Sequence, residues 1–280
     1  MQPNRTARNI SQIYLSILPF LVVALAFAVG HISYYIYLPI WIVNSLLMIF
    51  AVWTLGAHKF RSADADKKHV IVVAWLLIVP WIFISMFFGM GPPPTTIKGW
   101  VELATEQEIR YIILIVGGIS ITFGLALLRE QLKQTGERFY SLFGFMSIVI
   151  AAPLFIINWA YWGIYLPKAF QVFYASGTPA KRPDWYAPLQ WFFYEIGIVE
   201  VGLIYLSTAA FAAALQKAGW FKTGASRVYI ALSFVGLALC VLPVDLPEPL
   251  ATMGYFSCIP AISILMLYFM AINLLRRAGN

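Results

Sequence analysis

The sequence predicts an all-α integral membrane protein: a polytopic bundle of about eight transmembrane helices that forms one domain over residues 1–280. Composition is the first reason, because 61% of the 280 residues are hydrophobic and only 11% are charged, whereas a soluble domain carries about 25% charged residues. Spacing is the second reason. Apolar runs of about 20 residues, the length that a ~30 Å hydrocarbon core requires, recur along the chain.

The first four predicted spans are separated by short polar segments. The first run, IYLSILPFLVVALAFAVG, follows a basic N-terminus as a secretory signal does, but the chain begins at Met1 and we therefore expect a retained helix. The basic segment HKFRSADADKKH precedes the third span, which must end before the triple proline of residues 92–94 because proline cannot continue a helix. Thr105 and Glu108 form a capping box, so the fourth helix is expected to begin near Glu106.

The last four predicted spans follow the same pattern. REQLKQTGERF leads into the fifth span, and an aromatic, proline-rich segment (163–188) separates the fifth from the sixth. Within that segment we expect KAFQVFYA to lie along the membrane surface or over the mouth of the bundle. QKAGWFKTGASR precedes the seventh span and LPVDLPEPL follows it. The predicted spans are residues 11–30, 38–57, 70–90, 107–128, 139–163, 188–215, 227–243 and 250–275.

The distribution of basic residues predicts the orientation. Of the 19 Lys and Arg residues, five lie on the side opposite to the termini and the other 14 lie on the side of the termini. The five are Lys98, Arg110, Lys168, Lys181 and Arg182. By the positive-inside rule, both termini are then cytoplasmic. Topology also accounts for the net charge of +7, so we expect no nucleic-acid partner. A retained first helix without an organelle address favours a bacterial inner membrane.

The absence of several sequence motifs excludes the chemistries that depend on them. The three histidines, His31, His58 and His69, lie outside the predicted spans, so no span supplies the ligands of a membrane b-type haem. There is no C-x-x-C-H, H-E-x-x-H, Walker or G-x-S-x-G motif. We therefore expect no metal and no cofactor. Cys240 and Cys258 allow one disulfide, but both lie in or near apolar helices, where free thiols are expected.

The sixth span carries the residue that calls for a functional explanation. Glu200 lies about 24 Å above the cytoplasmic end of its helix, and Glu195 about 31 Å, at the outer interface. Glu195 needs no functional explanation, because lipid headgroups and water solvate a carboxylate at the interface. An acid within a span costs roughly 2.5–3.5 kcal/mol, and such residues face the bundle interior or water. The two glutamates point about 140° apart, so at most one faces a given cavity. The structural alternative is a protonated Glu200 hydrogen-bonded to a neighbouring helix.

Aromatic and amide side chains gather at the same outer level. An aromatic belt at headgroup depth explains most of them, but not Asn158 and Glu200, which lie among apolar neighbours. An aromatic cup with one buried acid suits a cationic ligand. The inner half of the spans offers no continuous polar path, which argues against an ion channel. The predicted ligand-binding residues are Asn44, Asn158, Trp162, Trp191, Tyr194, Glu195 and Glu200.

Three hypotheses for the function follow. The first is a protein that binds or transports a small apolar, amphipathic or cationic ligand in an outward-facing cavity, with Glu200 as the counter-charge. The second is an intramembrane enzyme that acts on a lipid or isoprenoid, with Glu200 or Asp184 as catalytic general acid. The third is a non-catalytic subunit. Its partners, beyond the lipid bilayer, would be another membrane protein or a second copy of the chain.

Overall fold

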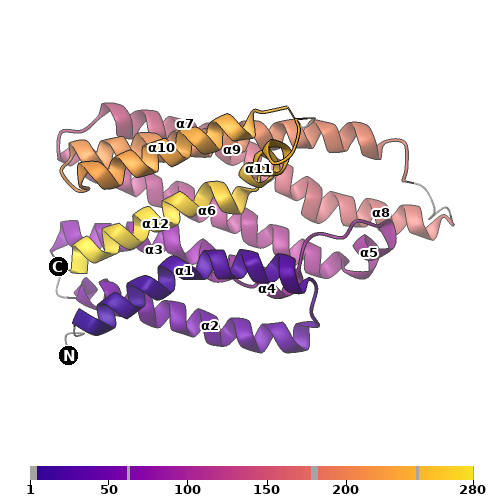
Figure 1. Ribbon diagram of the computed structural model, residues 1–280, viewed down its shortest axis with the longest axis horizontal. Coiled ribbons are helices and arrows are strands. Elements are labelled where there is room, and N and C mark those ends of the chain that lie inside the picture. The colour runs from indigo at the N-terminus through magenta and orange to yellow at the C-terminus, as the bar shows by residue number, and fades with distance from the viewer. Residues whose placement is uncertain (1–4, 62–63, 178–181, 244–245, 280) are drawn as a thin grey trace.

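The computed structural model describes residues 5–61, 64–177, 182–243 and 246–279 (Figure 1). Within these ranges 85% of the residues are helical and there is no strand. The elements are α1 (Arg5–Val29), α2 (Tyr34–Leu55), η1 (Ala57–Arg61), α3 (Ala65–Ile84), α4 (Phe87–Met90), α5 (Ile97–Glu102), α6 (Ala104–Gln134), α7 (Phe139–Ala160), η2 (Tyr161–Tyr165), α8 (Leu166–Ala175), α9 (Tyr186–Lys217), α10 (Thr223–Cys240), α11 (Leu250–Ser257) and α12 (Pro260–Gly279). The predicted all-α bundle is confirmed.

Eight helices in the described part of the chain are long and apolar enough to cross a membrane: α1, α2, α3 with α4, α6, α7 with α8, α9, α10 and α12. Their outward faces are apolar as well. Leu46, Phe50, Phe123 and Phe143 are each at least half exposed. Large contiguous apolar surfaces are rare on soluble monomers. The length of the helices and their exposed apolar faces together indicate a multi-pass membrane protein.

The core of the bundle is built on α3, α9 and α12, the most buried of the long helices. α9 packs mainly against α7 and α10, and α3 against α6 and α12. α7 and α9 approach closely because Gly144 has no side chain: a Cβ there would lie 2.9 Å from the ring of Phe211. Across the same contact the Ser207 hydroxyl donates to the Gly144 carbonyl at 2.8 Å. Both chain ends lie at one end of the bundle, and α5 and α8 lie at the other (Figure 1).

The structure differs from the prediction at two helix boundaries. The continuous helix over residues 250–275 is two helices, α11 and α12, because α12 begins anew at Pro260, whose ring fits the start of a helix. α6 begins at Ala104, so Thr105 lies inside the first turn and caps nothing. The segment KAFQVFYA belongs to α8, which continues from α7 through the π-helical turn η2 and packs against α5 at the end of the bundle away from the termini.

Candidate functional site

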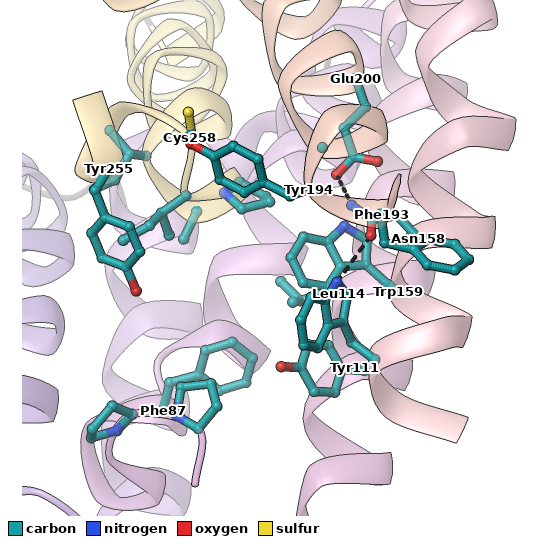
Figure 2. A pocket seen from close by; sticks show the side chains of 18 of the residues that line it. Phe87, Tyr111, Leu114, Asn158, Trp159, Phe193, Tyr194, Glu200, Tyr255 and Cys258 are labelled. Atoms are coloured by element: carbon teal, nitrogen blue, oxygen red, sulfur yellow. Dashed lines mark hydrogen bonds between the residues drawn. The ribbon is translucent and has the colours of Figure 1, made fainter. Parts of the chain in front are cut away.

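A cavity of about 730 Å³ lies between the helices in the half of the bundle away from the termini. Its walls are the last turns of α1, α3, α7 and α10, the first turns of α6 and α9, and the α11–α12 segment. Each wall helix starts or ends at this level, so side chains from distant parts of the sequence converge there. Figure 2 shows them pointing inward from several helices. The volume is typical of a pocket for a small organic molecule.

Glu200 forms the polar centre of one side of the cavity. It sits in the fourth turn of α9 and its side chain is fully buried. Its Oε1 accepts a hydrogen bond from Asn158 Nδ2 at 3.1 Å, whereas Oε2 is buried without any partner. Gly197, one turn earlier on α9, makes room for this contact, since a Cβ there would lie 3.3 Å from Asn158 Nδ2. Glu200 therefore has one satisfied and one unsatisfied oxygen.

The amide of Asn158 connects Glu200 to the aromatic wall. Its Oδ1 accepts from Trp162 Nε1 at 3.1 Å, so a chain of hydrogen bonds runs from Trp162 through Asn158 to Glu200 (Figure 2). Trp162 lies within the π-helical turn that follows α7. Such turns are rare and frequently mark functional sites. Trp159 lies close to the same carboxyl, but its Nε1–H makes no hydrogen bond.

Aromatic rings form most of the remaining wall. Tyr111 of α6 stacks on Trp159 with ring centroids 5.4 Å apart. Tyr194 of α9 points across the cavity towards Cys258 and lies above the level of Tyr111 (Figure 2). A surface of this kind favours apolar groups and organic cations over small hydrated ions.

The structure brings together five of the residues predicted from the sequence. Asn158, Trp162, Trp191, Tyr194 and Glu200 all line the cavity. The other three predicted site residues, Glu195, Asp184 and Asn44, lie outside the cavity.

Glu195 and Asp184 are exposed and do not line the cavity. Glu195 lies on the opposite face of α9 from Glu200, as five residues of separation require. Asp184 lies in the turn before α9. Neither carboxylate can therefore share a ligand with Glu200 inside the cavity.

Asn44 is part of a different contact. Its Oδ1 accepts from the Tyr14 hydroxyl at 2.7 Å, and its Nδ2 donates to Ser85 Oγ at 3.0 Å. These bonds join α2 to α1 and to the end of α3. The side chain is therefore used in helix packing, and it does not line the cavity.

Arg110 lines the cavity although the sequence indicated only a basic residue on the outer side. It is 4% exposed, and its Nη2 donates to the carbonyls of Met90 at 2.9 Å and Gly91 at 2.8 Å. A signal for its burial exists in the sequence. Arg110 shares a helix face with Leu114 and Gly117, at spacings of four and seven residues, and both of these face the interior.

Two free cysteines complete the wall near Tyr194. Cys258 Sγ lies 3.3 Å from Cys240 Sγ, and both residues line the cavity. Over the described ranges, no group of three His, Cys, Asp or Glu side chains could hold a metal ion. The chemistry available in the cavity is that of one acid, one guanidinium, two amides (Asn158 and Gln190), two thiols and many aromatic rings.

Fold and cavity together define a multi-pass helical membrane protein with an acid-bearing aromatic pocket near one end of its bundle. Compared with family models, curated proteins and solved structures, the chain shows no match. Its function is therefore argued from the geometry of the cavity.

Proposed function

We propose that this protein binds a small ligand in the cavity, and that the ligand has an apolar body and a cationic or hydrogen-bond-donating group that contacts Glu200. The observation that carries the proposal is the unpartnered Oε2 of Glu200, buried at an aromatic wall. A buried polar group without a partner costs roughly 1–3 kcal/mol in proteins. Glu200 is closed off from the cavity space at 0% exposure, so a ligand donor reaches Oε2 after a shift of the neighbouring side chains and would then remove that cost.

The surroundings of Glu200 favour such a ligand over a purely structural role. None of the ion pairs among the described residues includes Glu200. An ionised carboxylate in this position has no protein cation to balance it, whereas a ligand cation would supply the charge. Trp162, Trp191 and Tyr194 line the same space. Aromatic faces attract organic cations by about 0.5–2 kcal/mol per contact.

Binding from one side fits the rest of the bundle. Ser207 and Thr208, buried polar residues on the inner half of α9, both donate to backbone carbonyls. The Ser207 hydroxyl joins α9 to α7, the Thr208 hydroxyl bonds the preceding turn of α9, and neither residue lines the cavity. We therefore propose a binding protein or carrier in a bacterial inner membrane, with both termini cytoplasmic and the cavity on the outer side. The positive-inside distribution of Lys and Arg supports this orientation.

Mass spectrometry of small molecules retained through purification tests the proposal. The wild type is compared with Glu200→Gln, which keeps the shape of the side chain and an acceptor for Asn158 but removes the charge. We expect a defined species in the wild type that is depleted at least about tenfold in Glu200→Gln, the loss of one charge-assisted hydrogen bond. Glu195→Gln is the matched control, since it removes the same charge from the exposed face of the same helix.

Other outcomes point to the other functions. A retained species that the wild type converts into a second product, and that Glu200→Gln retains unchanged, would support the intramembrane enzyme. Because Asp184 is exposed, Glu200 would be the general acid of such an enzyme. Identical bulk phospholipid in all three proteins would refute ligand binding at Glu200, and would favour a subunit that docks another membrane protein or a second copy.

A further inference from the structure

We propose that Arg110 forms an anion-binding subsite in the same cavity, so that the ligand carries a carboxylate or phosphate group at the end remote from Glu200. The inference rests on the proposed function and specifies the chemistry of its ligand. Sequence reasoning alone treats Arg110 as a determinant of topology. Its burial, its hydrogen bonds and its place in the cavity assign it a second role.

Most of the hydrogen-bonding capacity of Arg110 is unused. A guanidinium has five N–H donors, and Nη2 uses two of them on the carbonyls of Met90 and Gly91. Nε is buried without a partner, and Nη1 makes no hydrogen bond within the described residues. Nη1 therefore keeps two donors for a ligand, whereas Nε is closed off from the cavity. Because both bidentate edges of a guanidinium include Nη2, an anion would be held by Nη1 through a charge-assisted hydrogen bond, and the two bonds from Nη2 would fix the plane of the group.

The charge of Arg110 also lacks a direct ion pair, although the carboxylate of Glu106 lies close enough to attract it. None of the ion pairs among residues 5–61, 64–177, 182–243 and 246–279 includes it. Glu106 lies one turn earlier on α6, but its Oε2 is 2.9 Å from Nε2 of His31, and it makes no hydrogen bond to Arg110. A guanidinium that is 4% exposed and lacks an ion pair is a costly arrangement. An anion inside the cavity would balance it.

Arg110 and Glu200 occupy different sides of the cavity. The guanidinium carbon of Arg110 lies 5.5 Å from the centre of the Phe87 ring. Figure 2 shows Phe87 at one end of the site and Glu200 at the other, with Tyr111 and Trp159 between them on one wall. A single ligand that satisfies both ends is therefore an elongated amphiphile. It has an anionic group at the Phe87 end, an apolar middle, and a donor or cation at the Glu200 end.

Probes of equal chain length and different head group test the subsite. Decanoate, decyl phosphate and decanol are titrated at pH 8 into protein in a non-ionic maltoside detergent, and binding is followed by the fluorescence of the cavity tryptophans. We expect decanoate, decyl phosphate or both to bind the wild type at least about tenfold more tightly than decanol, as a charge-assisted hydrogen bond requires. The comparison of decanoate with decyl phosphate distinguishes a carboxylate ligand from a phosphate one.

Variants separate anion binding from structural anchoring of the loop at Met90 and Gly91. Arg110→Gln should bind decanol as the wild type does and lose the preference for the anions. Arg110→Lys keeps the charge and should keep part of the preference. Arg182→Gln is the matched control, because Arg182 also donates to a backbone carbonyl, that of Thr95 at 2.7 Å, and contacts a ring, but does not line the cavity.

Each remaining outcome decides against the subsite alone or against both proposals. Equal affinity of decanol and the anions for the wild type would overturn the Arg110 subsite and leave the proposed function standing. An Arg110→Gln protein that loses decanol and anions in equal measure would show that the side chain only holds the loop. A wild type that binds none of the three probes would refute ligand binding itself, and the subsite with it.

Discussion

Replacing Asn158 by leucine would remove the side chain that joins Glu200 to Trp162. The amide is 2% exposed and makes two hydrogen bonds of 3.1 Å, one from its Nδ2 to Glu200 Oε1 and one from Trp162 Nε1 to its Oδ1. Hydrogen bonds between membrane helices contribute about 0.6 kcal/mol on average and up to about 1.7 kcal/mol. Leucine also leaves Glu200 without any partner. We expect a loss of roughly 1–3 kcal/mol in unfolding free energy.

A double-mutant cycle isolates the contact between Asn158 and Glu200. Unfolding of the wild type, Asn158→Leu, Glu200→Leu and the double variant is followed by circular dichroism during titration with sodium dodecyl sulfate. Removing both partners leaves no unpaired carboxyl, so the double variant should be more stable than the sum of the single losses implies. The expected coupling is about 0.6–1.7 kcal/mol.

The cycle has an internal control in Asn44. That amide also bridges two side chains, Tyr14 and Ser85, but makes no contact with Glu200. Asn44→Leu should cost a similar amount alone and add to Glu200→Leu within about 0.5 kcal/mol. Additivity in the Asn158 cycle as well would refute the reasoning, because it would mean that Asn158 and Glu200 do not share a hydrogen bond.

Three further outcomes are expected. Gly163→Ala should destabilise the protein by roughly 1–3 kcal/mol in the same detergent titration, because the added Cβ would overlap the side chain of Tyr111 on α6. Gly224→Ala is the control: its Cβ would meet open space, so the change should be neutral or stabilising. Tetrathionate should oxidise Cys240 and Cys258 to an intramolecular disulfide, seen by mass spectrometry as the loss of two hydrogen atoms, since their sulfurs are 3.3 Å apart; an unchanged mass would show that the thiols do not meet. In a variant without other cysteines, Lys98→Cys should react in intact cells with a membrane-impermeant maleimide, and protection of that site would reverse the proposed orientation.

The number of helices could be predicted from the sequence because hydropathy reports the length of apolar segments directly. The boundaries of the helices were harder to predict from the sequence. The break before Pro260 follows from the proline itself and was overlooked. The continuation of α7 into α8 depends on tertiary packing, such as the contact between α8 and α5, which a single helix does not encode.

For the site residues, the sequence indicated the level of each residue along its helix better than the neighbour that its side chain faces. Counting residues from the end of a span gave the level of Glu200, and its partner Asn158 was recognised as a polar residue at the same level. Counting could not tell which helix faces which. Asn44 was therefore assigned to the cavity although it bonds Tyr14 and Ser85. Arg110 was missed because an arginine near a helix start is usually explained by the membrane surface.

The tight seam between α7 and α9 has a consequence for how the cavity fills. Gly144 meets Phe211 there with no spare room, and the Ser207 hydroxyl is bonded across the gap. Passage to the far side would require these two helices to separate along their most closely packed stretch. A carrier of the kind proposed would therefore have to part α7 from α9 in each cycle. A protein that only binds would keep this stretch closed, and its occupancy would follow the ligand concentration on the side of the cavity alone.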